Sequence, residues 1–216
     1  IIRGYATTIT DGFQGRTSGN GALVTTNFPT VTYTTGRLIA SGADFILYEN
    51  LNITSGSTTN TVTMGANCAM KSCAISQTGT NANSTAVLTG AASLVFDCDL
   101  TLAGASGGLA AISAGGVDTR IIANRIKGGT SIGIHSAAVR IVAVDNLVFA
   151  STGVGISITG TATPCTIYGN TIVGGGGDGV DIITGTTVLQ FVINNMINGN
   201  AGNGVDGVAV SNAIFA

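Results

Sequence analysis

Short runs of alternating apolar and polar residues recur along most of the chain, separated by turns rich in Gly, Asn and Asp. Alternation with a period of two predicts β-strands that bury one face in a core. The clearest pattern is a large apolar residue, any residue, Asn or Cys, any residue, and then an aliphatic residue. It occurs at residues 96–100, 122–126, 144–148, 168–172 and 193–197.

The central residue of this pattern is an anchor that returns at a regular interval. With two weaker copies upstream, successive anchors are 22–26 residues apart. A Gly followed by an aliphatic residue stands nine residues after each of the last four anchors. Two patterns that keep phase predict a repeat architecture, in which each repeat is one coil. The anchors are Asn50, Cys73, Cys98, Asn124, Asn146, Asn170 and Asn195.

The repeat predicts one all-β domain, a right-handed single-stranded parallel β-helix of about seven to eight coils of 22–26 residues, over residues 38–216. Residues 1–37 keep no coil period and are predicted to be an irregular lead-in or N-terminal cap. Within one coil we expect three short strands, at residues 120–123, 125–127 and 132–136. Each is too short to be stable alone and must pair with the coils on either side.

The anchors lie at the bend between two strands, where the chemistry of Asn explains why the residue recurs. An inward Asn side chain offers donors and acceptors to its neighbours in the stack, which satisfies the polar groups of the turn without water. We therefore expect a structural ladder of anchors. Cys73 and Cys98 lie one coil apart in it and are predicted to remain thiols. Cys68 and Cys165 each lie five residues before an anchor, four coils apart, and cannot bond to each other.

The Asn-x-Ile bends, the Gly-Ile-x-Ile strands and the coil length resemble the pectate-lyase-like superfamily of right-handed parallel β-helix proteins, over about residues 38–212. That superfamily includes polysaccharide lyases, glycoside hydrolases, bacterial surface proteins and virion proteins such as phage tailspikes. The resemblance implies a fold rather than an activity. In its enzymes the active site usually lies on outward residues of the strand that corresponds to Gly-Ile-x-Ile.

On that strand, the outward residues in consecutive coils are His135, Ser157, Asp181 and Asp206. Asp181 and Asp206 are expected about 5 Å apart, close enough to share a cation or to act as a carboxylate pair. These two and His135 are the candidate catalytic residues. Asp178, Asp181 and Asp206 are the candidate metal ligands, for a single calcium ion. No other cofactor is expected.

Composition narrows the classes of partner. Only 8% of residues are charged, the net charge is −2, and 44% of residues are hydrophobic. This composition favours a packed, turn-rich β structure. It predicts no positively charged surface of the kind that binds nucleic acid or an anionic membrane. No apolar run approaches 18 residues, so membrane insertion is not expected. The chain begins without Met or a signal peptide, so we expect a processed or internal piece of a longer protein.

These observations favour a structural or adhesive module of a virion or extracellular surface assembly, of the fibre, tailspike or decoration type, with glycans as candidate ligands. The alternative is a polysaccharide lyase or glycoside hydrolase that uses Asp181 and Asp206, although no basic residue is expected beside them on that strand. We expect a homo-oligomer, with a trimer as the first candidate, or a neighbouring structural protein as partner. Contacts are expected at the apolar chain ends and at small outward residues, namely Gly133, Ala137, Gly155, Ser157 and Gly179.

Overall fold

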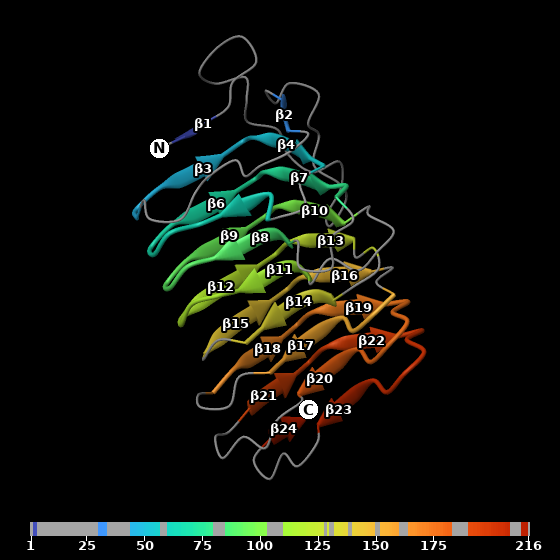
Figure 1. Ribbon diagram of the computed structural model, residues 1–216. Helices are drawn as coiled ribbons and strands as arrows, with labels where there is room; N and C mark the ends of the chain where they lie inside the picture. The colour runs from blue at the N-terminus through green and yellow to red at the C-terminus, as the bar shows by residue number, and fades with distance from the viewer. Residues whose placement is uncertain are drawn as a thin grey trace.

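The protein is a β-solenoid in which short strands wind around three faces of one elongated core (Figure 1). In the described residues every regular element is a β-strand, and each strand pairs in parallel with a strand of a neighbouring coil. The computed structural model describes residues 2–3, 30–33, 44–56, 60–79, 85–102, 110–127, 129, 132–137, 140–149, 152–159, 164–182, 190–207 and 213–215.

Three parallel sheets form the faces of the solenoid. The nine-stranded sheet contains β1 Ile2–Arg3, β3 Leu47–Glu49, β6 Ala69–Lys71, β9 Leu94–Phe96, β12 Thr119–Ile122, β15 Ile141–Val144, β18 Thr166–Tyr168, β21 Gln190–Ile193 and β24 Ala213–Phe215. The eight-stranded sheet contains β2 Thr30–Tyr33, β4 Asn52–Ser55, β7 Ala74–Gln77, β10 Asp99–Leu102, β13 Arg125–Lys127, β16 Leu147–Phe149, β19 Thr171–Val173 and β22 Met196–Asn198. The seven-stranded sheet contains β5 Val62–Thr63, β8 Thr85–Thr89, β11 Ala110–Ala114, β14 Ile132–Ser136, β17 Ile156–Ile158, β20 Val180–Ile182 and β23 Val205–Gly207.

The fold class is the one predicted from the sequence. The seven-stranded sheet has six coil-to-coil pairings, so the solenoid makes about six full turns, slightly fewer than the seven to eight coils expected. Strands β12, β13 and β14 match the three strands predicted for one coil to within one residue. Within the predicted lead-in, β1 pairs with β3 and β2 pairs with β4. The boundary near residue 38 stays a prediction.

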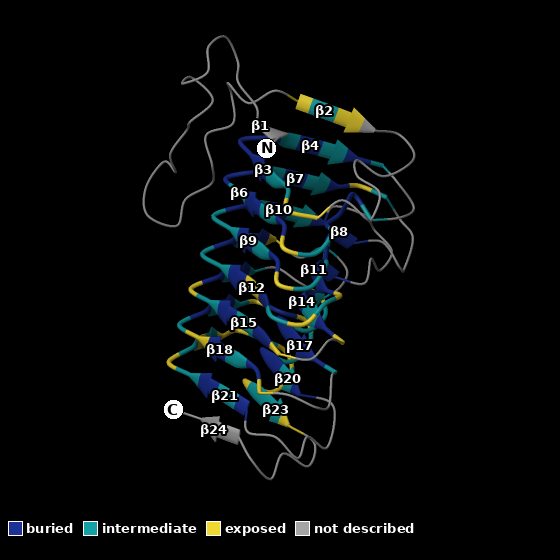
Figure 2. Ribbon diagram, turned by 90° about the vertical axis from the view of Figure 1, so that its left-hand side faces the viewer, coloured by how far each residue is buried: buried dark blue, intermediate teal, exposed yellow. Residues whose placement is uncertain are grey.

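The core is a stack of aliphatic side chains, one layer per coil. Figure 2 shows buried residues on the strands of successive coils along the solenoid. In one coil Ile121, Ile126 and Ile134 come from the three different sheets, and none is exposed to solvent. Because the strands are in register, each layer packs on the same positions of the next coil. The hydrophobic effect therefore acts on the solenoid as a whole, since no coil could enclose a core alone.

Side-chain amides form a continuous ladder at the corner between the nine- and eight-stranded sheets. The Oδ1 of Asn146 accepts the backbone N–H of Asn124 at 2.9 Å, and its Nδ2 donates to the carbonyl of Ile121 at 2.8 Å. Asn124, Asn170 and Asn195 make equivalent bonds to the coil that precedes each of them. Each ladder residue thus satisfies a backbone donor and a backbone acceptor of the coil before it.

The two cysteines of the column extend this stack toward the N-terminus. The backbone N–H of Cys73 donates to the Sγ of Cys98 at 3.5 Å, and Cys98 in turn donates to Asn124. Burial raises the pKa of Cys98 well above its ordinary range, with Cys73 as the next cause. All four cysteines are buried thiols, which confirms the thiol state predicted for Cys73 and Cys98. Cys68 and Cys165 lie in one column four coils apart, too far to bond to each other.

Asn50 lies outside this column, and its prediction as a ladder residue was wrong. The pairing of Glu49 with Lys71 and of Asn52 with Ala74 aligns Leu51 with Cys73. Asn50 belongs to the preceding column of turn residues, where φ is positive, between 49° and 66°. Asn, Asp and Gly tolerate this left-handed conformation best, and they fill five of the seven positions. The members are Asn50, Ser72, Asp97, Ala123, Asp145, Gly169 and Asn194.

A column of glycines marks the corner at which the chain enters the seven-stranded sheet. A Cβ on Gly155 would lie 2.6 Å from the carbonyl oxygen of Gly179 and would overlap the Cγ2 of Ile172. A Cβ on Gly133 or Gly179 would likewise overlap an aliphatic side chain and a glycine carbonyl oxygen of the adjacent coil. All three are buried, so their prediction as outward, exposed residues was wrong. Of the small residues predicted on the surface, Ala137 is exposed and Ser157 is fully buried.

The ladder predicts a large loss of stability for Asn146→Leu. The substitution leaves the N–H of Asn124 and the carbonyl of Ile121 buried without partners, and each such group costs about 1–3 kcal/mol. Urea unfolding should show at least that loss. Asn198→Leu is the matched control, because Asn198 is exposed at the end of β22. Equal stability of the two variants would contradict the structural role of the ladder.

The glycine corner predicts opposite results for one substitution at two positions of the same column. Gly155→Ala should destabilise by about 1–3 kcal/mol, because the added methyl overlaps both a side chain and a carbonyl. Gly204→Ala should be tolerated, since nothing lies within 4 Å of the added Cβ. The measurement is the thermal unfolding midpoint of each variant. If both variants lowered the unfolding midpoint by a similar amount, close packing would not be the reason that glycine is required in this column.

Candidate functional site

The four residues predicted to share an outward column do so. His135 pairs with Ser157, Ser157 with Asp181, and Asp181 with Asp206, on strands β14, β17, β20 and β23. The side chains face away from the core because the residues that flank them, such as Ile156 and Ile158, belong to it. The regular pairing of short strands is therefore what aligns these residues over four coils.

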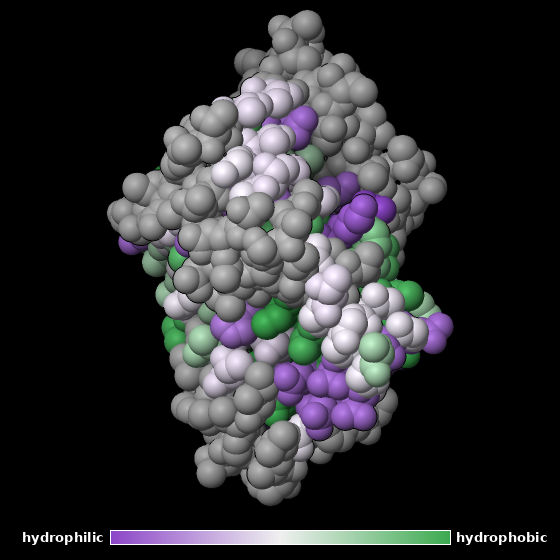
Figure 3. Space-filling model, turned by 45° about the vertical axis from the view of Figure 1, so that its right-hand side comes forward, coloured by the Kyte–Doolittle hydropathy of each residue, from purple (hydrophilic) through white to green (hydrophobic). Residues whose placement is uncertain are grey.

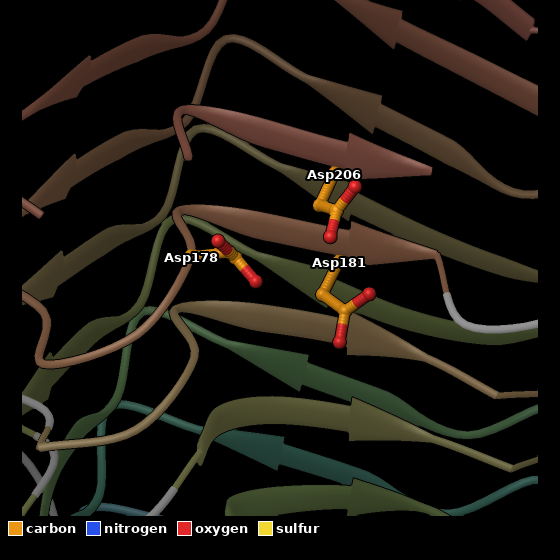
Figure 4. A group of neighbouring side chains, drawn as sticks. All are labelled: Asp178, Asp181 and Asp206. Atoms are coloured by element: carbon orange, nitrogen blue, oxygen red, sulfur yellow. The ribbon is translucent and has the colours of Figure 1, made fainter. Parts of the chain in front are cut away.

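Three carboxylates of two successive coils converge on this face. Asp178 lies in the turn before β20, Asp181 on β20 and Asp206 on β23, and one carboxylate oxygen from each lies within 4.8 Å of the other two. Figure 4 shows that Asp178 lies beside Asp181, and that the Asp181 and Asp206 side chains both extend toward the preceding strand. These are the three residues predicted as metal ligands, and the structure brings them together. We call them the aspartate cluster.

Backbone geometry holds Asp178 in place. Its Oδ1 accepts the N–H of Asn203, which lies in the turn before β23, at 2.6 Å. Its carbonyl oxygen accepts the N–H of Gly155 from the coil before, at 3.0 Å. The residue is thus tied to both neighbouring coils, and its carboxylate has a fixed position relative to β20 and β23.

The aspartates repel one another. The pKa of Asp181 is raised from its ordinary value of 3.8 by partial burial first, and then by the negative charges of Asp178 and Asp206. No basic side chain is among the groups that shift it. Hydrophilic side chains gather toward the C-terminal end of the molecule in the space-filling view (Figure 3). An added positive charge would be the simplest way to offset this repulsion.

His135 and Ser157 are not part of the aspartate cluster, although they share its column. The Nε2 of His135 faces the hydroxyl of Thr159 at 3.3 Å, and its Nδ1 is buried without a partner. Burial lowers the pKa of His135, which favours the neutral ring. Ser157 has no exposed surface, and its Oγ forms no hydrogen bond. The alternation of residues predicted the direction of Ser157 but could not predict what covers it.

Sequence reasoning missed a hollow of about 560 Å³ on the outer face of the nine-stranded sheet. Leu94, Arg120 and Val142 line it from three adjacent coils, and Asp118 and Arg140 line its edge as an ion pair. Arg140 holds the pKa of Asp118 below its ordinary value. Asp118 and Arg140 hold the same turn position in successive coils, 22 residues apart, so the coil spacing could have indicated the ion pair but not the hollow.

No protein-family model matches the chain, and no match was found among curated proteins or solved structures. In the described part of the chain, no helix is long and apolar enough to cross a membrane.

The raised pKa of Asp181 predicts how stability depends on pH in a metal-chelating buffer. Because its pKa is raised in the folded state, protonated Asp181 stabilises the fold relative to ionised Asp181. This stabilisation is fully present below pH 3.8 and is lost as pH rises through the raised pKa. Asp181→Asn should therefore be more stable than the original chain at neutral pH, by roughly 0.2–1 kcal/mol, the usual size of a cross-strand charge effect. The gain should disappear toward pH 3.8.

Urea unfolding across this pH range makes the measurement. Asp145→Asn is the control, because Asp145 is exposed in a turn and lies outside the aspartate cluster. A loss of stability for Asp181→Asn at neutral pH in chelator would show that repulsion within the cluster does not dominate.

Proposed function

We propose that this chain is a structural or adhesive module of an extracellular or virion-surface assembly, and that it works as a homo-oligomer. The observation that carries the proposal is a second apolar surface, outside the core. On the outer face of the nine-stranded sheet, five consecutive coils place a large apolar residue at the same position. These residues, which we call the apolar column, are Phe96, Ile122, Val144, Tyr168 and Ile193.

The apolar column does not belong to the interior of the chain. The residues between its members and the core, such as Val95 and Ile121, already fill the inner face. Tyr168 is 43% exposed, and the other four members are half-buried. At the usual strand spacing the column is about 19 Å long, and it is flanked by further apolar residues, including Phe191 on β21. A continuous apolar strip of this kind is typical of a surface that packs against another subunit.

A rigid rod suits such an assembly. The core and the amide ladder continue from coil to coil, so the outer face of the nine-stranded sheet keeps one register over the five coils of the apolar column. The subunit contact is therefore assigned to the apolar column, in place of the buried glycines, and the hollow around Arg120 lies beside that column on the same face. The resemblance to pectate-lyase-like proteins of the virion or extracellular type supports three-fold association as the first candidate.

Adhesion to glycans has one supporting feature, the hollow around Arg120. Arg120 is exposed, with apolar Leu94 and Val142 on either side and the Asp118–Arg140 pair at the edge. Sugars present both polar edges and apolar C–H faces, and a hollow of this composition fits both. Glycan contact there is part of the proposal.

A polysaccharide lyase or glycoside hydrolase fits the aspartate cluster less well. Such chemistry needs a group that transfers a proton beside the carboxylates. His135, the nearest candidate in the column, is two coils from Asp181, and its Nε2 faces Thr159. The charged groups that act on Asp181 are carboxylates alone. The structural reading therefore accounts for more of the described surface.

The proposal predicts that Tyr168→Arg weakens self-association without unfolding the chain. A charge in the centre of an apolar contact should weaken association at least about ten-fold, while the exposed position leaves the fold intact. Light scattering over a range of protein concentrations measures it. Met196→Arg, at a 59% exposed apolar residue of the neighbouring sheet, is the matched control. A monodisperse monomer of the original chain would overturn the proposal, as would an equal effect of both variants.

A further inference from the structure

We propose that the aspartate cluster and the hydroxyl of Ser157 bind one calcium ion, and that this ion ties the C-terminal coil of the solenoid to the coil before it. The ligands come from the turn before β20, from β20 itself, from β23 and from β17. Cation binding by a single chain does not require the oligomer proposed above.

The spacing of the carboxylates suits calcium. Calcium binds oxygens at 2.3–2.6 Å, so two oxygens on one ion lie at most about 5 Å apart. The three carboxylates offer oxygens within 4.8 Å of one another, which meets this limit. Magnesium binds at 2.0–2.1 Å, which limits the separation of two oxygens on one ion to about 4.2 Å and is a stricter demand on the cluster. The geometry therefore favours the larger ion.

Ser157 is the independent observation that points to a ligand. Its side chain has no exposed surface, and its Oγ makes no hydrogen bond. It pairs in register with Asp181 and faces the same side of the sheet, and Figure 4 shows the Asp181 carboxylate extending toward β17, the strand that carries Ser157. A buried hydroxyl beside a carboxylate ordinarily donates to it. An ion at this position would use the unpartnered oxygen as a neutral ligand.

The location explains what the ion would do. Strands β22 and β23 of the last coil have no fully buried residue, in contrast to β16 and β17 two coils earlier. The last coil therefore gains less from the core than the inner coils do. A cation bound by Asp206 on one side and by Asp178 and Asp181 on the other would compensate for that deficit and would remove the repulsion between the three charges.

The test is thermal unfolding of the chelator-treated chain as calcium is added, followed by circular dichroism, with magnesium at the same ionic strength as the reference. The midpoint should rise with calcium, with a Kd of about 10⁻⁴ to 10⁻³ M, as in extracellular calcium modules. Asp206→Asn and Asp181→Asn should each weaken the apparent affinity at least about ten-fold. Ser157→Ala should weaken it less, and Asp145→Asn should leave it unchanged.

Amide hydrogen exchange of the original chain gives a readout that needs no variant. Calcium should slow exchange in β20 and β23 and leave β9 unaffected. The proposal is overturned if calcium changes neither the unfolding midpoint nor this exchange, or if both Asp variants respond to calcium as the original chain does. A response to magnesium equal to that to calcium would overturn the assignment of calcium.

Discussion

The solenoid depends on hydrogen bonds that cross from one coil to the next at its corners. Along the sheets, parallel strands satisfy each other's backbone groups, but at a corner the backbone leaves the ladder. Between the nine- and eight-stranded sheets, the side-chain amides of Asn124, Asn146 and Asn170 replace the missing partners. Because each of these residues bonds to the coil before it, the corner also fixes the register of the strands that follow.

The apolar column and the aspartate cluster both depend on this register. The apolar column exists because Ile122, Val144 and Tyr168 pair directly with one another, and the aspartate cluster because Asp181 pairs with Asp206. A slip of one residue in any coil would turn these side chains to the other face of their sheet. The proposed contacts with a second subunit and with calcium therefore rest on the corner that aligns the coils.

The sequence was sufficient for the architecture, because strictly repeated positions carry information in a solenoid. The Asn anchors from 124 onward and the cysteines at 73 and 98 could be placed from spacing alone, and so could Asp178, Asp181 and Asp206. Asn50 was misplaced because Asn is also favoured in the left-handed turn position one residue earlier. The repeat predicts Gly133, Gly155 and Gly179 on the surface, but these positions are buried and leave no room for a Cβ. The burial of Ser157 and the hollow beside Arg120 depend on three-dimensional packing that no periodicity encodes.

Hydrogen exchange at the ladder residues tests this account most directly. The backbone amides of Cys98, Asn124, Asn146 and Asn170 donate to side-chain oxygens inside the corner, at 2.9 Å in each case. Measured by NMR on the isolated chain, they should exchange as slowly as the amides of the central strands β12 and β15. Exchange near the rate of an unstructured peptide at these four positions would contradict the claim that the amide ladder holds the coils in register.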